Sequence, residues 1–217
     1  ARPEGRARME AAVTMLMERS AGDLLDAFAA ATPTPGGGSA AALAGALGAS
    51  LLRMVAAMSR TRTGADLERA ALDALLDPLD GARWRLAALV DEDAAAYETV
   101  MAAFTLPKAT DEEKAARKQA IQHATRAATD TPLGVMRVAA AALAAGATVA
   151  RHGNRNAASD VRVGILLLVA ACEGAYENVA INVPGLPDAD RAHVEAAAAA
   201  ARAEAEQAAH DARSALA

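Results

Sequence analysis

The sequence predicts an all-α protein folded as a single-domain helical bundle. Hydrophobic residues make up 53% of the chain and aromatic residues only 2%, because much of the apolar content is alanine. Alanine is the best helix former and adds little volume, so a core made from it requires helices that pack closely. Apolar residues recur at helical spacing, and no segment shows the alternation typical of a strand. The length of 217 residues suits one large domain.

Residues that cap or break helices divide the chain into segments, without an internal repeat or an evident domain boundary. Residues 1–19 are interpreted as an N-terminal extension with a first helix, and residues 20–217 as the helical domain. The expected helices cover about residues 7–19, 21–31, 39–60, 65–104, 111–129, 132–150, 157–181 and 188–217.

The boundaries in the first half follow from capping residues, proline and glycine. Ser20 and Asp23 have the spacing of a capping box, which predicts that a helix starts directly after Ser20. The run 32–38 holds two prolines and three glycines and is expected to end that helix. Ser39 is a favoured N-cap residue and is expected to begin the next helix. Pro78 predicts a kink or break in the long segment that follows.

The boundaries in the second half are marked in the same way. Pro132 is expected to open a new helix at an N1-like position, where its missing N–H would have no partner in any case. Gly153 lies in a segment that is expected to form the C-cap and turn after that helix. Pro184 and Pro187 end the apolar helix before them, and Asp188 is expected to open the last helix.

Composition and charge argue against several classes of function. The net charge is −5 at pH 7 and the basic residues are scattered, whereas a nucleic-acid surface needs clustered lysine and arginine. The one cysteine, Cys172, cannot form an internal disulfide and suits a reducing cytoplasm. No stretch of about 18 apolar residues is free of charge, and the N-terminus has no signal pattern. We therefore expect a cytoplasmic protein that binds neither nucleic acid nor membranes.

The strongest local feature is a glycine-rich segment before the third expected helix. Glycine lets a ligand approach the backbone closely, and the helix N-terminus offers free N–H groups and the positive end of the dipole. The segment is therefore a candidate site for an anion or carboxylate, and a plain helix–helix connection is an equal alternative. A dinucleotide-binding fingerprint is rejected, because it requires a preceding strand and the residues before this segment are helical. The candidate binding residues are Pro35, Gly36, Gly37, Gly38 and Ser39.

Two acidic residues within one expected helix are candidates for catalysis. On a helical wheel Asp93 lies at the edge of the apolar stripe, and Asp91 lies about 100° away, next to Ala87 and Ala94. Small neighbours would let a ligand approach Asp91, and burial would raise its pKa into a range useful for proton transfer. Asp91 is therefore the first candidate for a catalytic acid or base, and Asp93 is the second. The alternative, a solvated acidic face, is favoured by the residue pattern alone.

Polar side chains in two later segments are candidates for substrate binding. Asn178 and Asn182 are four residues apart and share one helix face, and their amides can both donate to and accept from a polar heterocycle. Asn154, Asn156 and Asp160 lie in an earlier turn. Helix capping and hydrogen bonding between helices are the alternative roles of these residues. The four histidines have no metal-ligand spacing, so we expect no metal site.

Four stretches, taken together, make the chain resemble the family of formiminotetrahydrofolate cyclodeaminases and methenyltetrahydrofolate cyclohydrolases. The motifs PTPGGGS and AFxLPKxTxEEK are specific, whereas the alanine between them is not. The stretches occur in the family's order within about residues 20–190: PTPGGGSAAALAGALGASLLRMVA, LVDEDAAAYETVMAAFTLPKATDEEKAAR, GNRNAASD and GAYENVAIN.

The resemblance implies a fold, a substrate class and a site. The fold would be helical, like the C-terminal cyclodeaminase domain of formiminotransferase-cyclodeaminases, and the substrate would be a tetrahydrofolate derivative. A carboxylate acid/base is implied at the LVDED motif, which maps to Asp91. The glycine loop and the asparagine-bearing segments would line the site. A homo-oligomer built on dimers is also implied, and a small-residue stripe at positions 41, 45 and 48 would suit a contact within or between subunits.

Two reactions remain open for such an enzyme. One converts 5-formiminotetrahydrofolate to 5,10-methenyltetrahydrofolate and ammonia, and the other hydrolyses 5,10-methenyltetrahydrofolate to 10-formyltetrahydrofolate. Both pass through a tetrahedral carbon between two nitrogens, so one positioned carboxylate can serve either reaction. No cofactor beyond the folate substrate is expected. A non-catalytic folate-binding protein and a helical scaffold are the alternatives to an enzyme.

Overall fold

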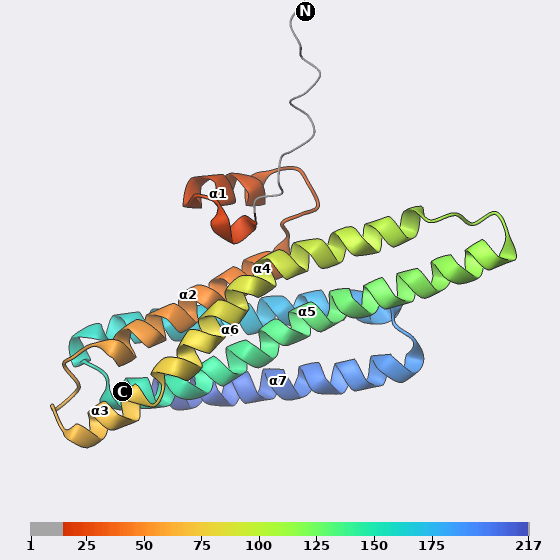
Figure 1. Cartoon of the computed structure of the whole chain (residues 1–217). Coiled ribbons are helices and arrows are strands. Elements are labelled where there is room, and N and C mark those ends of the chain that lie inside the picture. Colours follow the sequence, from red (N-terminus) through yellow and green to blue (C-terminus); the bar gives the residue numbers. More distant parts are fainter. Residues whose placement is uncertain (1–14, 217) are drawn as a thin grey trace, which may run out of the picture.

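The computed structural model describes residues 15–216, which form helices and connecting turns with no strand among them (Figure 1). The all-α prediction is confirmed. Three short 3₁₀ turns, η1 to η3, accompany the α-helices. The elements are η1 Leu16–Glu18, α1 Ala21–Ala29, α2 Gly37–Ala57, α3 Asp66–Asp73, α4 Leu76–Thr105, α5 Asp111–His152, η2 Arg155–Ala157, α6 Ala158–Asn182, η3 Val183–Gly185 and α7 Asp188–Ser214.

Helix α2 packs against α4 and α6 and, less extensively, against α5, while α7 packs on α5 (Figure 1). The small residues of α2 allow this close packing. A Cβ added to Gly48 would lie 2.8 Å from Leu168 Cγ, and one added to Gly45 would lie 3.1 Å from Ala171 Cβ. The small-residue stripe at 41, 45 and 48 is therefore buried within the chain rather than exposed for a second subunit.

Several expected boundaries agree with the structure and others differ. Ser20 caps α1 as predicted, because its hydroxyl accepts the Asp23 backbone N–H at 3.1 Å. Ser39 is not an N-cap, since α2 already begins at Gly37 with Gly36 as its cap. The segment 65–104 forms two helices that divide before Pro78, which lies in the first turn of α4. Of the expected helix 7–19, only residues 15–19 are described, and they contain the 3₁₀ turn η1.

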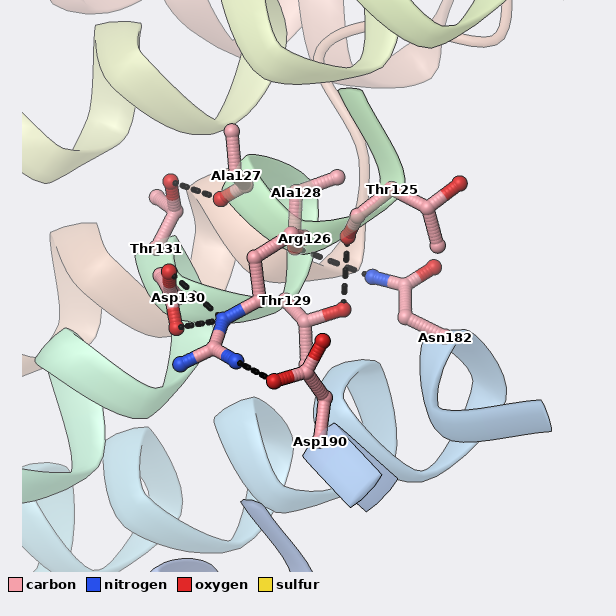
Figure 2. A network of polar contacts seen from close by, with 9 residues as sticks. All are labelled: Thr125, Arg126, Ala127, Ala128, Thr129, Asp130, Thr131, Asn182 and Asp190. Atoms are coloured by element: carbon pink, nitrogen blue, oxygen red, sulfur yellow. Dashed lines mark hydrogen bonds and ion pairs between the residues drawn. The ribbon is translucent and has the colours of Figure 1, made fainter. Parts of the chain in front are cut away.

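Helix α5 runs unbroken through Pro132, so the prediction that this proline opens a new helix is wrong. A proline inside a helix leaves the carbonyl four residues earlier without its N–H partner, which here is the carbonyl of Ala128. The side-chain amide of Asn182 donates to that oxygen at 3.0 Å (Figure 2). A residue of α6 thus satisfies the acceptor that the proline leaves free, and the helix continues.

Three helical segments are long and apolar enough, by length and composition, to cross a membrane: 37–57, 111–152 and 155–185. In the bundle 50, 61 and 39% of their most apolar windows are buried against other helices. Their hydrophobicity therefore serves the core to a large extent, and the absence of membrane binding stays a prediction.

Candidate active site

The N-terminus of α2 and the middle of α4 meet at one carboxyl group. The hydroxyl of Ser39, in the first turn of α2, lies 2.9 Å from Asp93 Oδ2 and 2.9 Å from the carbonyl oxygen of Val90. A hydroxyl has one hydrogen, so it can donate to only one of them at a time. When it donates to Val90, a protonated Asp93 can donate to Ser39 Oγ. The pair can therefore hold the Asp93 carboxyl in either protonation state.

Glycines 37 and 38 make room for this carboxyl group and for a neighbouring amide. A Cβ on Gly38 would lie 2.6 Å from Asp93 Cγ, closer than side chains pack in proteins. A Cβ on Gly37 would lie 3.5 Å from Asn178 Nδ2, which is an ordinary contact. Helices α2, α4 and α6 thus each contribute to one polar cluster, which we call the Asp93 cluster: Gly37, Gly38, Ser39, Asp93 and Asn178.

The environment of Asp93 shifts its protonation equilibrium toward the neutral form, relative to a carboxyl in water. Burial raises the pKa of the carboxyl above its usual value, and the hydrogen bonds from Ser39 oppose this only in part. A raised pKa makes the ionised carboxylate a stronger base and so favours its use in proton transfer. Asp93 therefore has the properties of a general acid or base, beside a helix N-terminus that can bind an anionic or polar group.

Asp91, the first candidate for catalysis, contacts the backbone of η1. Its Oδ1 accepts the backbone N–H of Leu16 at 2.5 Å, and its Oδ2 lies 3.4 Å from the N–H of Met17. The carboxylate thereby caps the turn η1 and holds the N-terminal segment on α4. These contacts favour Asp93 over Asp91 as the proton-transfer group.

A cavity of about 540 Å³ lies between α4 and the segment from η1 to Pro35, and no residue of the Asp93 cluster lines it. Asp91 and Pro35, both predicted, line it. Arg19 and Glu98 line it as well, and sequence reasoning missed them as site residues. Glu98 follows Asp91 by two helical turns and so shares its face, which is a signal the sequence contained. Nothing in the sequence pairs Arg19 with these residues, because the turn η1 brings it there.

The remaining predicted binding residues lie elsewhere in the chain. Asn154, Asn156 and Asp160 are at the opposite end of α2, where a Cβ on Gly153 would lie 2.9 Å from Val55 Cγ1. Because α2 has 21 residues, about 30 Å separates that end from the glycine loop. Asn154 accepts the Asn156 backbone N–H at 3.0 Å and caps η2. One chain therefore does not bring these residues to the Asp93 cluster.

Asn182 is also engaged, since its amide bonds to Ala128 on α5. Next to it, Arg126 forms ion pairs with Asp130 at 3.0 Å and with Asp190 of α7 at 2.9 Å (Figure 2). Asn182 and this network hold α5, α6 and α7 together. Asn182 thus has a structural contact, and its predicted binding role stays a prediction. Among residues 15–216, no three His, Cys, Asp or Glu side chains gather as a metal site would require.

An all-helical domain in which a glycine-rich helix N-terminus faces a partly buried carboxyl group of raised pKa has the groups that acid–base catalysis on a small polar substrate requires. The chain belongs to the formiminotransferase-cyclodeaminase family, whose model matches residues 20–209.

Individual relatives are similar over most of this chain. The methenyltetrahydrofolate cyclohydrolase of Methylorubrum extorquens is 42% identical over 76% of this chain and 79% of that protein. The formimidoyltransferase-cyclodeaminase of Gallus gallus is 35% identical over 80% of this chain, which spans only 32% of that longer protein. The crystal structure of formiminotetrahydrofolate cyclodeaminase from Thermotoga maritima matches 91% of this chain and 96% of its own, with a TM-score of 0.80 and 27% identity.

Proposed function

We propose that the protein hydrolyses 5,10-methenyltetrahydrofolate to 10-formyltetrahydrofolate, with Asp93 as the general acid and base. The observation that carries the proposal is the Asp93 cluster, in which a carboxyl of raised pKa lies against the glycine-rich start of α2. The similarity to the Methylorubrum cyclohydrolase, which extends over 79% of that protein, supports hydrolysis as the reaction.

The proposed reaction needs one carboxyl group that takes up and returns a proton. Water attacks the cationic methenyl carbon, and the ionised carboxylate of Asp93 accepts a proton from it. The resulting tetrahedral carbon carries a hydroxyl between N5 and N10. Its bond to N5 then breaks, Asp93 returns the proton to N5, and the hydroxyl loses its proton to solvent as the formyl group forms on N10.

The surroundings of Asp93 suit this substrate. The methenyl bridge carries a positive charge, and the cavity along α4 that Pro35 of the glycine loop lines has two acidic side chains, Asp91 and Glu98, and one basic side chain, Arg19, in its wall. Asn178 lies beside Gly37, and its Nδ2 donates to the Gly174 carbonyl at 2.8 Å, which leaves the amide oxygen and the second N–H for the pterin ring. The glycine loop, with Pro35 at the cavity, remains the proposed substrate-binding segment.

Cyclodeamination is the second candidate, favoured by the similarity to the Thermotoga cyclodeaminase along almost its whole length. In this reaction N10 attacks the carbon of the protonated formimino group on N5, and Asp93 accepts the N10 proton. Asp93 then returns that proton to the amino group on the tetrahedral carbon, and ammonia leaves as the cationic methenyl bridge forms. The same carboxyl group serves both reactions, because both form a tetrahedral carbon between the same two nitrogens.

The test uses purified protein with each folate in turn. Loss of the 5,10-methenyltetrahydrofolate chromophore measures hydrolysis, and ammonia released from the 5-formimino compound measures cyclodeamination. Asp93→Asn should lower turnover by about 10²–10⁴-fold, the usual contribution of general acid–base catalysis. Asp91→Asn should be much milder, since Asp91 holds η1. Binding of either folate without turnover would refute the proposed catalysis and indicate a folate-binding protein. Absence of binding to both folates would favour a helical scaffold.

We further propose that the protein is a cytoplasmic homodimer that needs no metal and no cofactor beyond its folate substrate. The lone cysteine supports the reducing compartment, because Cys172 is buried and a raised pKa, about 11, keeps its thiol protonated and unreactive. Turnover that is unchanged by a chelator and by gel filtration would support the absence of metal and cofactor.

A further inference from the structure

One apolar stripe on α4 is buried before Asp93 and exposed after it. Leu86 and Val90 are fully buried, whereas Tyr97 and Phe104 are 39% and 50% exposed. All four side chains lie on one side of the helix by their spacing, and Asp93 lies at the edge of the same stripe. The exposed part of the stripe therefore begins one helical turn beyond the Asp93 cluster.

The change in exposure follows from the position at which α2 begins. Helices α2 and α4 are antiparallel, because Gly45 lies against Leu86 while Gly38, in the first turn of α2, lies against Asp93. Helix α4 continues past the start of α2, so α2 does not cover the residues after Asp93 (Figure 1). We call these side chains the exposed α4 stripe: Tyr97, Met101 and Phe104.

A basic side chain of α5 lies at the far end of the exposed α4 stripe. Arg117 donates to the carbonyl oxygen of Phe104 at 3.1 Å, and its guanidinium carbon lies 5.6 Å from the centroid of the Phe104 ring. Its buried Nε has no hydrogen-bond acceptor among residues 15–216. Within the same part of the chain, Arg117 forms no ion pair. Its positive charge is therefore left for a ligand.

The motif AFxLPKxTxEEK builds the turn that holds Arg117 in this position. Thr110 and Glu113 form a capping box at the start of α5, and Glu113 also accepts the backbone N–H of Ala109 at 2.7 Å. Lys114 pairs with Asp111 at 2.8 Å. These side chains are thus occupied within the turn, and Arg117, which follows the motif, is the group of this segment that contacts the stripe.

The exposed α4 stripe suits the part of a folate that the Asp93 cluster leaves unbound. In the proposed reaction the reacting carbon lies at Asp93. N10 carries a benzoyl ring, and a glutamate with two carboxylates follows that ring. Along α4, Tyr97 lies about 6 Å beyond Asp93 and Phe104 about 16 Å beyond it. Aromatic rings pack well on one another, and a carboxylate pairs with a guanidinium, so the stripe offers these groups in the order of the substrate.

We infer that the exposed α4 stripe binds the aminobenzoyl ring of the folate, and that Arg117 binds a carboxylate of its glutamate. This inference rests on the proposed function, because it concerns the same substrate. The alternative place for the glutamate is the cavity that Arg19 lines. Asp91 and Glu98 lie in the wall of that cavity and would repel a carboxylate, so the charges favour Arg117.

The first experiment compares two substrates that differ only in the glutamate. They are 5,10-methenyltetrahydrofolate and the analogue in which a methylamide replaces the glutamate. Arg117→Gln should raise KM for the folate about tenfold and leave kcat unchanged, because a hydrogen-bonded ion pair far from the reacting carbon is lost. Its KM for the methylamide should equal that of the wild type. Lys118→Gln, which removes the same charge from the next, exposed position, is the matched control and should change neither KM.

The second experiment tests the ring. Tyr97→Ala should raise KM about threefold to tenfold for both substrates, since both carry the benzoyl ring. Tyr97→Phe keeps the aromatic ring and should behave like the wild type. The two positions therefore have different signatures: the loss at Tyr97 is independent of the glutamate, and the loss at Arg117 requires it.

Three results would overturn the inference. An equal rise of both KM values in Arg117→Gln would show that Arg117 only holds the end of α4. A glutamate-dependent rise in Arg19→Gln instead would place the glutamate in the cavity between α4 and η1. Unchanged KM values in Tyr97→Ala would remove the stripe from the site. If a thermal melt shows Arg117→Gln unfolded, Arg117→Lys takes its place, and it should raise KM for the folate alone, by a smaller factor.

A binding measurement separates this inference from the proposed function. A wild type that turns over neither folate refutes the proposed function. Calorimetry with 5-formyltetrahydrofolate and its methylamide analogue then still tests the stripe: the wild type should bind the glutamate compound about tenfold more tightly, and Arg117→Gln should bind both alike. An active enzyme that does not distinguish the two substrates refutes the role of Arg117 and leaves the proposed reaction unaffected.

Discussion

Replacing Gly38 by alanine should damage catalysis far more than folding. The added Cβ would lie 2.6 Å from Asp93 Cγ and 2.8 Å from its Oδ2, where ordinary contact begins at 3.4 Å. Either α2 or the carboxyl must therefore move by about 1 Å. A displacement of that size at a reacting group costs about 10²-fold in rate, whereas the overpacking costs about 1–3 kcal/mol of stability.

The assay is turnover of 5,10-methenyltetrahydrofolate at saturating substrate, together with a thermal melt of each variant. Gly37→Ala is the matched control, because its Cβ would lie 3.5 Å from Asn178 Nδ2 and requires no movement. Both glycines are in the first turn of α2, so both substitutions change the helix propensity in the same direction. Gly37→Ala should keep turnover within a few fold of wild type.

Two results would refute this reasoning. A folded Gly38→Ala enzyme with full turnover would show that the position of Asp93 does not matter for the reaction. Equal losses of turnover in Gly37→Ala and Gly38→Ala would show that the reaction needs the backbone freedom of both glycines. The loss in Gly38→Ala would then not be caused by contact with Asp93.

Three further predictions concern stability. Burial raises the pKa of Asp93 above 3.8, so the folded protein keeps the proton on this carboxyl to a higher pH than the unfolded chain does. The resulting stabilisation is lost as pH rises through the raised pKa. Asp93→Asn should therefore remove this part of the pH dependence of the melting temperature. Hydrogen bonds lower the pKa of Glu68 from 4.5 to about 2, so Glu68→Gln should lower the melting temperature at neutral pH, by an amount that vanishes as pH falls toward 2. Asn182→Leu should cost about 1–3 kcal/mol in chemical denaturation by leaving the Ala128 carbonyl unpaired, and less in a Pro132→Ala background, where a backbone N–H replaces the amide; equal costs in both backgrounds would contradict this role.

The helices were largely predictable because their signals are local. Ser20 caps α1 through a side chain that bonds three residues ahead, and Pro187 with Asp188 marks the start of α7. Alanine and leucine at helical spacing predict the helices between such marks, whatever the rest of the chain does. The glycine segment before α2 was identified for the same reason, since its composition differs from its surroundings.

The predicted helix boundaries were wrong where a residue far away in the sequence supplies a hydrogen-bond partner. Pro132 ends a helix by the local rule, and α5 continues because Asn182, fifty residues later, bonds to the free carbonyl. Ser39 has the chemistry of an N-cap, but its hydroxyl bonds to Val90 and Asp93 on another helix. Each of these contacts joins residues that are far apart in sequence, and no local pattern records them.

The sequence by itself determined that this protein is an all-helical bundle of its family, with a glycine-rich helix start and a pair of acidic residues two apart on α4. Only the tertiary structure distinguishes the environments of those two acids. They point in different directions from one helix, so the neighbouring elements set their environments: η1 supplies backbone N–H groups to Asp91, while α2 packs over Asp93 and partly buries it. Burial and hydrogen bonding depend on which elements pack together, and therefore the raised pKa of Asp93 is a property of the fold.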